Sequence, residues 1–200
     1  RVETLPNGVD VERFRPVETA GFRARRGLDA DRPLVGYTGR HGHEKRLDLL
    51  VEAAADLDAT VVLAGDGPAR SDLERIAADT DGDVRFLGFL ERDDLPAFYA
   101  SLDVFAFPSP VETQGIVALE AMACGTPVVA AEAGALTETV VAGVTGLHFE
   151  PGDVGGLREA IRGALDERER LGEACLDRRE TTSVANAVDR LAEVYGSLAG

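Results

Sequence analysis

Two glutamates in an unusual setting mark the stretch PVETQGIVALEAMACGTPVV. Glu112 precedes the glycine Gly115, and Glu120 lies eight residues after Glu112 in an alanine-rich apolar run that is typical of a buried helix. A helix beginning at Gly115 leaves its first N–H groups, those near Ile116 and Val117, free to hold an anion such as a phosphate. A carboxylate only accepts hydrogen bonds, so glutamates on either side of a phosphate suit neutral hydroxyl groups. Sugar, phosphate and ribose in that order predict a nucleotide sugar as the ligand.

Two cations lie in a second chemistry-bearing segment, GRHGHEKR, which contains Arg40 and Lys45. Arg40 offers a planar fork to phosphate oxygens and Lys45 a point charge, and each charge-assisted hydrogen bond contributes about 1.5–3 kcal/mol. Taken singly, such residues are more typical of solvated loop charges, but Lys45 is the only lysine in the chain. His41 and His43 flank a glycine with no third ligand nearby, so we expect them in a solvated loop and predict no metal site.

The overall composition excludes several classes of protein. A net charge of −15 argues against nucleic acid as a partner and against anionic lipid heads as a direct ligand. Only two cysteines occur, Cys124 and Cys175, and without neighbouring ligands they predict buried structural thiols. No apolar run approaches the length of a membrane span, and the first residues do not resemble a signal peptide, so the expected location is the cytoplasm. The acidic, arginine-rich composition is typical of an acidic proteome.

The elements that must position these residues follow from the hydrophobic pattern. Six apolar runs alternate with amphipathic stretches that begin near residues 44, 68, 92, 115 and 136. The runs read PLVGYTG, TVVLAGDG, VRFLGF, DVFAFPS, TPVVAA and GLHFE. Continuous apolar strands that alternate with helices predict an α/β fold with a doubly wound, six-stranded parallel sheet of Rossmann-like type flanked by helices. The last 50 residues carry three helical periods and no strand signal.

The whole chain, 1–200, reads as one domain with a binding site at one edge of its sheet. Ligands of open α/β sheets bind at the carboxyl ends of the strands, where the cationic and acidic segments converge. Neither a phosphate-binding P-loop nor a G-x-G-x-x-G fingerprint occurs, which argues against a P-loop NTPase and an ordinary NAD-binding domain. Residues 1–16 are expected to connect to another domain rather than join the core, and residues 180–200 to form a closing helix.

Several motifs together resemble one enzyme family. They are the E-x7-E pattern from Glu112 to Glu120, the segment GVTGLHFEPGD, and the shorter GR with EK, LAGDGP and FLGFL. On these motifs the chain resembles the C-terminal, donor-binding half of the retaining glycosyltransferases of family 4, which have the GT-B fold. One departure is Arg46, where many members have glycine; another is Val184, where an aromatic residue is frequent.

The resemblance implies a role for each site residue. Arg40 and Lys45 would bind the donor diphosphate and Glu112 a hydroxyl of the transferred sugar, which makes these three the catalytic set. Glu120 would bind the ribose hydroxyls. Backbone groups complete the donor site at Leu90, which would meet the base, and at Gln114, Gly115, Ile116 and Val117, which would meet the sugar and phosphate.

The same resemblance implies an activity and its partners. The activity is transfer of a hexosyl group, with retention of configuration, from a nucleotide-diphosphate sugar. A UDP-sugar is expected as the donor in preference to a GDP-sugar, and neither a cofactor nor a metal is expected to be required. The acceptor, a membrane lipid or a glycan, would be bound by an N-terminal domain that this chain lacks, so the isolated domain is expected to be inactive. The full-length protein would lie at the inner face of the membrane. The alternatives are a GT-B nucleotide-sugar epimerase or phosphorylase and a noncatalytic nucleotide-sugar-binding module.

Overall fold

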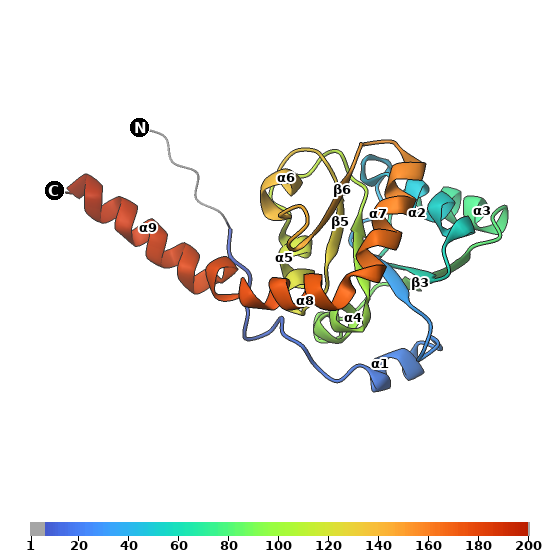
Figure 1. Ribbon diagram of the computed structural model, residues 1–200, viewed down its shortest axis with the longest axis horizontal. Helices are drawn as coiled ribbons and strands as arrows, with labels where there is room; N and C mark the ends of the chain where they lie inside the picture. The colour runs from blue at the N-terminus through green and yellow to red at the C-terminus, as the bar shows by residue number, and fades with distance from the viewer. Residues whose placement is uncertain (1–6, 200) are drawn as a thin grey trace.

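A six-stranded parallel sheet forms the centre of the domain (Figure 1). The computed structural model describes residues 7–199. The strands are β1 (Leu34–Thr38), β2 (Thr60–Ala64), β3 (Asp83–Gly88), β4 (Val104–Phe107), β5 (Val128–Ala131) and β6 (Gly146–Phe149). Their order is β3-β2-β1-β4-β5-β6, and every neighbouring pair is parallel. The predicted six-stranded, doubly wound sheet is confirmed, and each strand lies within its predicted apolar run except β3, which begins one residue earlier, at Asp83.

The four central strands owe their positions to burial on both faces. Every residue of β1, β2, β4 and β5 is buried, which explains why these segments are largely apolar instead of alternating between apolar and polar residues. β1 is paired with β2 on one side and β4 on the other, with Val35 opposite both Val61 and Val104. The order therefore reverses between β1 and β4, and the chain leaves these two strands in opposite directions.

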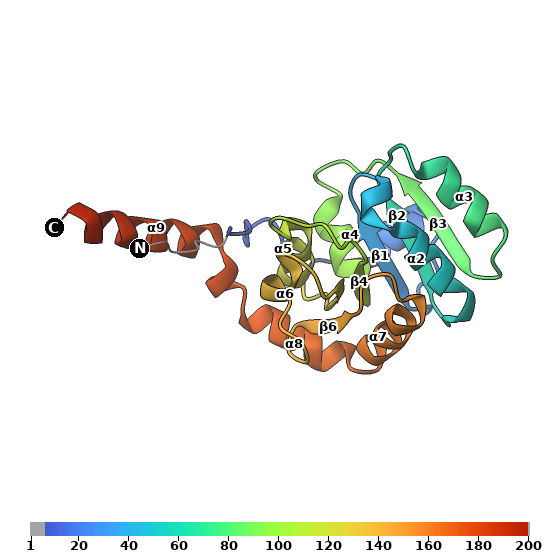
Figure 2. The same ribbon diagram turned by 90° about the horizontal axis from the view of Figure 1, so that it is seen from above.

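Helices cover both faces of the sheet (Figure 2). They are α1 (Ala20–Arg25), α2 (Leu47–Ala53), α3 (Arg70–Ala78), α4 (Leu95–Ser101), α5 (Ile116–Ala123), α6 (Leu136–Thr139), α7 (Val154–Asp166), α8 (Arg168–Asp177) and α9 (Val184–Ala199). Helix α7 packs on β4, β5 and β6 and against α2, which also contacts α3, whereas α5 packs on β4 and β5 and contacts α4. The three helices predicted after the last strand are α7, α8 and α9.

The N-terminal segment packs into the core, which corrects one expectation. Val9, Val11 and Phe14 are all buried. The backbone of Val9 also pairs with the segment before α9, because its N–H donates to the carbonyl of Thr182 at 2.8 Å. Part of the predicted connection therefore belongs to the core, which the expectation of a connecting segment did not include. The first six residues lie outside the described part of the chain.

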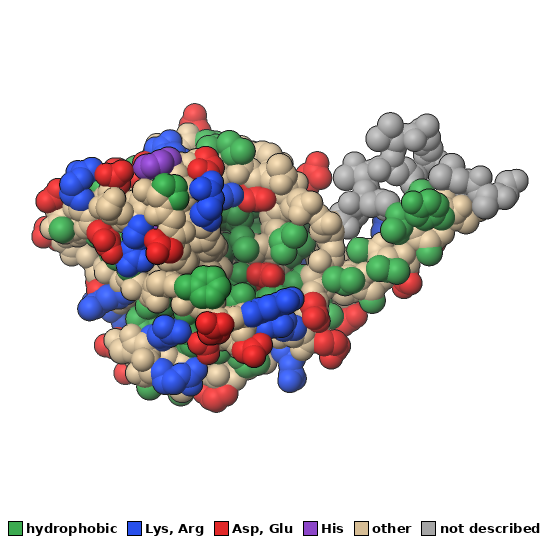
Figure 3. Space-filling model, turned by 180° about the vertical axis from the view of Figure 1, so that it is seen from behind, with side chains coloured by type: hydrophobic (Ala, Val, Ile, Leu, Met, Phe, Trp, Pro, Cys, Tyr) green, Lys and Arg blue, Asp and Glu red, His purple; other side chains and the backbone are tan. Residues whose placement is uncertain are grey.

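Helix α9 projects away from the rest of the domain (Figures 1 and 2). Its apolar residues Val184, Val188, Leu191 and Tyr195 are 47%, 56%, 40% and 64% exposed. Their spacing places them along one side of the helix. Hydrophobic side chains also line this projecting part of the chain in the space-filling view (Figure 3). No helix among the described residues is long and apolar enough to cross a membrane.

Candidate functional site

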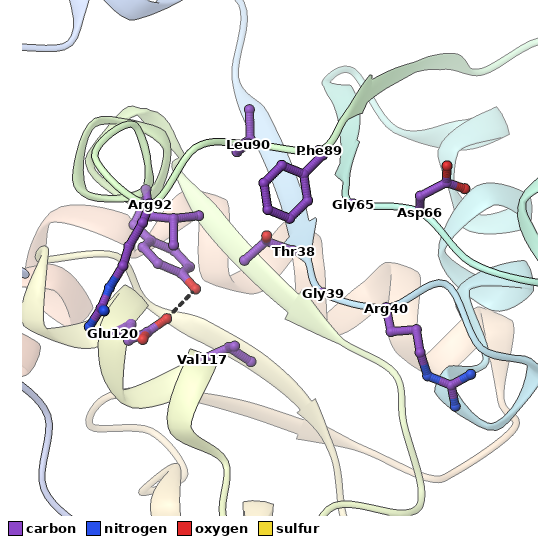
Figure 4. A pocket seen from close by; sticks show the side chains of 12 residues that line it. Thr38, Gly39, Arg40, Gly65, Asp66, Phe89, Leu90, Arg92, Val117 and Glu120 are labelled. Atoms are coloured by element: carbon purple, nitrogen blue, oxygen red, sulfur yellow. Dashed lines mark hydrogen bonds between the residues drawn. The ribbon is translucent and has the colours of Figure 1, made fainter.

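A cavity opens beside the point where the strand order reverses, between the segments that follow β1, β2 and β3 and helices α4 and α5 (Figure 4). This is where ligands bind in open α/β sheets. Its volume is about 470 Å³. The lining comes from the segments after β1, β2 and β3 and from α4 and α5: Thr38, Gly39, Arg40, Gly65, Asp66, Phe89, Leu90, Arg92, Leu95, Tyr99, Val117 and Glu120. Most of the wall is apolar, with Glu120 and Arg92 at one end and Arg40 at the other.

Glu112 lies in the loop between β4 and α5, with its carboxylate turned back onto its own backbone. One oxygen, Oε1, accepts hydrogen bonds from the N–H groups of Thr113, Gln114 and Gly115 at 3.0, 3.2 and 3.3 Å. The other, Oε2, lies 3.1 Å from Nζ of Lys45. In this structure, two of the backbone amides predicted to face the donor, those of Gln114 and Gly115, are thus occupied by the side chain of Glu112.

The two predicted phosphate-binding cations lie in one loop but differ in their surroundings. Lys45 is paired with Glu112, and the two side chains are only 20% and 16% exposed. Arg40 is paired with Glu44 four residues further along the chain, with side chains 61% and 41% exposed. The solvated setting that is typical of isolated loop charges describes Arg40 but not Lys45, which the fold brings against a residue 67 positions away.

Glu120 projects from α5 into the cavity, beside the start of α4. Its Oε2 accepts a hydrogen bond of 2.6 Å from the phenol of Tyr99, drawn as the dashed line in Figure 4. Tyr99 is fully buried. Within the described part of the chain, no other hydrogen bond of the Glu120 side chain is recorded, so its second oxygen is able to accept a hydroxyl from a ligand in the cavity.

The environments of the two glutamates shift their pKa values in opposite directions. Burial raises the pKa of Glu112, but the N–H groups of Gln114 and Gly115 and the Lys45 ammonium lower it more, so it lies below its ordinary value. Burial also raises the pKa of Glu120, and hydrogen bonding to Tyr99 offsets this only in part. Glu112 is therefore held as a carboxylate, whereas the ionised form of Glu120 depends on its neighbours.

Two backbone positions with positive φ shape the loops around the site. Gly115 has φ 66° immediately before α5, where a Cβ would lie 2.9 Å from Oγ1 of Thr139. Arg46 has φ 50°, the only positive φ of a non-glycine residue in the described chain. Glycine adopts this left-handed region without steric cost, which accounts for the frequency of glycine at the position of Arg46 in the family it resembles. The Arg46 guanidinium is instead anchored on Asp48, with Nη2 3.0 Å from Oδ2.

His41 is fully buried, which corrects the expectation that both histidines lie in a solvated loop. Its Nε2 lies 3.3 Å from the carbonyl of Ala64, and burial lowers the pKa of the imidazole. The N–H of His41 bonds to the carbonyl of Asp66, so β1 and β2 are joined beyond their ends. His43 is exposed, as expected. No group of three or more potential metal ligands occurs among residues 7–199.

The cavity brings together only part of the predicted set. Arg40, Leu90, Val117 and Glu120 line it. Lys45, Glu112, Gln114, Gly115 and Ile116 are not in its lining and lie in the cationic loop, the loop after β4 and the start of α5. Sequence reasoning missed Tyr99 and the 77% exposed Phe89. Phe89 directly precedes Leu90 and could have been found from that position; nothing in the spacing of Tyr99 and Glu120 signals their contact.

The strand order and the position of this cavity define a Rossmann-like domain of the kind that forms one half of a GT-B glycosyltransferase. The Anabaena protein HepE, solved with UDP and glucose, superimposes with a TM-score of 0.85 at 28% identity. The match covers 96% of this chain and 55% of HepE.

Sequence comparison identifies the family. The family model described as "Glycosyl transferases group 1" matches residues 19–178, and the chain belongs to this family. A sulfoquinovosyl transferase of Arabidopsis thaliana is 41% identical over 169 residues, which cover 81% of this chain and 32% of the relative. A GDP-mannose-dependent mannosyltransferase of Corynebacterium glutamicum is 38% identical over 180 residues, covering 82% of this chain and 47% of the relative. The chain spans half or less of the length of these relatives.

Proposed function

We propose that this chain is the donor-binding domain of a retaining, metal-independent hexosyltransferase of glycosyltransferase family 4. The observation that carries the proposal is the arrangement around the start of α5. Glu120 faces an apolar cavity on one side, and Glu112 meets the cationic loop of Arg40 and Lys45 on the other. A nucleoside fits the apolar cavity beside Glu120, and a diphosphate fits the cations Arg40 and Lys45. A hydroxyl of the sugar fits the carboxylate of Glu112.

The chemical contribution of the site is electrostatic. When the bond between the sugar and the diphosphate breaks, negative charge develops on the departing phosphate. Arg40, Lys45 and the free N–H groups of Ile116 and Val117 at the start of α5 stabilise that charge without a metal ion. Glu112 orients the transferred sugar through a hydroxyl and is not assigned as a nucleophile. For Lys45 to reach the diphosphate, its ion pair with Glu112 must loosen when the donor binds.

We further propose UDP-linked sugars as donors before GDP-linked ones. HepE, which shares the fold at 28% identity, was solved with UDP and glucose, whereas the Corynebacterium relative is described as GDP-mannose-dependent. The Corynebacterium relative is described as a mannosyltransferase of a monoacylated phosphatidylinositol monomannoside, which supports a membrane lipid as the acceptor, with a glycan as the other choice. The acceptor would be bound by a second, N-terminal domain, with the full-length protein in the cytoplasm at the inner face of the membrane.

Helix α9 supports the need for a second domain. Its apolar residues Val184, Val188, Leu191 and Tyr195 are each at least 40% exposed, and the relatives are at least twice as long as their matched parts. We propose that this side of α9 docks against the second domain and closes the cleft. Val9 pairs with Ser183 immediately before α9, so the segment proposed to connect the two domains lies next to this helix at that point.

Calorimetry with two glutamate variants tests the donor site. Glu120→Gln is expected to weaken UDP and UDP-glucose binding alike, because it changes the group that meets the ribose. Glu112→Gln is expected to leave UDP binding almost intact and to weaken binding only of the sugar-bearing donor. Glu159→Gln, an exposed change on α7, serves as the control. Loss of UDP binding in Glu112→Gln, or unchanged binding in Glu120→Gln, would contradict the proposed orientation.

A turnover assay distinguishes the proposed transferase from a noncatalytic nucleotide-sugar-binding module. A noncatalytic binding module would bind the same nucleotide sugars but release no nucleotide with the second domain and an acceptor present. The transferase is expected to release it only under those conditions. Membership of a glycosyl transferase family supports transfer over the epimerase and phosphorylase alternatives.

A further inference from the structure

A buried tyrosine stands directly behind the carboxylate assigned to the ribose. Tyr99 lies on α4, with edge-to-face contacts to Phe14, Phe98 and Phe105 at centroid distances of 5.9, 5.6 and 5.7 Å. Its backbone carbonyl accepts a hydrogen bond of 2.7 Å from Oγ1 of Thr126. Packing of its ring against these three aromatic side chains leaves the phenol little freedom, so its hydroxyl is a fixed donor to Oε2 of Glu120.

We propose that Tyr99 is a positioning residue that holds Glu120 in the orientation in which its second carboxylate oxygen accepts a ribose hydroxyl. The inference rests on the proposed donor site and adds to it a determinant of ribose recognition. A glutamate side chain has three rotatable bonds, and binding loses affinity when a flexible group must be ordered by the ligand. The bond to Tyr99 orders Glu120 before the nucleotide arrives.

The same hydrogen bond favours the ionised form of Glu120. The charged and titratable groups around this carboxylate are Tyr99 on α4, Arg92 before α4, Arg13 in the N-terminal segment and Cys124 after α5. Burial raises the pKa of Glu120, while Tyr99 and the two arginines lower it. Burial also raises the pKa of Tyr99 well above its ordinary value, so the phenol remains a donor at neutral pH.

Removing the hydroxyl therefore has a consequence that a purely structural residue would not produce. In Tyr99→Phe the pKa of Glu120 rises further, because a hydrogen bond to its charged form is lost. Protonation then occurs at a higher pH and removes an acceptor for the ribose. UDP affinity should accordingly begin to fall at a higher pH on acidification than in the wild-type protein.

The experiment compares UDP with 2′-deoxy-UDP and 3′-deoxy-UDP by calorimetry across a pH series. The wild-type protein should bind UDP about tenfold or more tightly than whichever of the two deoxy analogues binds more weakly. This is the loss of affinity expected when a hydrogen bond to a charged group is removed. Tyr99→Phe should reduce that preference to about threefold and move the fall in affinity to higher pH. Thr126→Val is the matched control: it removes the hydrogen bond to the Tyr99 carbonyl and should keep both the preference and the pH profile.

Two further measurements keep the outcome decisive. In a Glu120→Gln background, Tyr99→Phe should change the preference little further, because the two residues act through one contact. If Tyr99→Phe does not fold, Glu120→Asp is measured instead. This change shortens the side chain, moves the carboxylate away from the Tyr99 hydroxyl, leaves the core intact and should show the same reduced preference for UDP over its deoxy analogues. An unchanged preference and pH profile in Tyr99→Phe would overturn the inference while leaving the donor site standing. Absence of UDP binding, or of a ribose preference, in the wild-type protein would overturn both.

Discussion

The ion pair between Lys45 and Glu112 makes a quantitative prediction about stability. Nζ and Oε2 lie 3.1 Å apart, and the side chains are 20% and 16% exposed. Exposed pairs couple by about 0.2–1 kcal/mol, and breaking a buried pair costs about 3–5 kcal/mol. A pair shielded to this degree lies between these limits, so we expect a coupling energy of about 1–2 kcal/mol. In a domain of this size that corresponds to about 2–8 °C in Tm.

A double-mutant cycle measures this coupling directly. Lys45→Ala, Glu112→Ala and the double variant are unfolded in urea at near-neutral pH, and the departure from additivity gives the pair energy. The Arg40–Glu44 pair is a matched control in the same loop, because its side chains are 61% and 41% exposed. Solvent screens that pair, and its cycle is expected to be additive.

The pH dependence fixes the sign of the effect. The pKa of Glu112 is lower in the folded protein than its ordinary value of 4.5. Its contribution to stability is therefore fully present above that value and is lost as the pH falls through the lowered, folded-state pKa. Additive variants near neutral pH, or a coupling that persists after the carboxyl group is protonated, would refute the assignment of an ion pair.

Two other changes separate phosphate binding from backbone geometry. Arg40→Ala should weaken UDP binding by about tenfold or more and leave uridine binding unchanged, whereas Arg75→Ala on α3 should affect neither; equal losses for UDP and uridine would place Arg40 away from the diphosphate. Gly115→Ala should destabilise the domain by more than the about 1–2 kcal/mol of a left-handed alanine, because the new Cβ would lie 2.9 Å from Thr139 Oγ1. Gly27→Ala, at φ 63° with nothing within 4 Å, should show the backbone cost alone in the same urea titration, and equal losses would rule out crowding at Gly115.

The fold class was predictable because each element carries its own signal. The four central strands are buried on both faces and are therefore largely apolar, and six apolar runs separated by amphipathic stretches favour a parallel α/β sheet. Gly115 before an alanine-rich run likewise indicated where α5 begins, and α5 does begin at Ile116. These features depend on residues that are close together in the chain, so the local sequence pattern predicts them.

The strand order and the partners of the site residues depend on contacts between distant segments. The reversal between β1 and β4 places the cavity, and it brings Lys45 to Glu112 and Tyr99 to Glu120. Segment spacing carries no information about which strands become neighbours. The sequence alone thus determined the elements and the kinds of side chain that follow each strand. Only the tertiary structure decided that Glu112 occupies its own loop amides and that Glu120 has a buried tyrosine behind it, because long-range packing sets side-chain direction and burial.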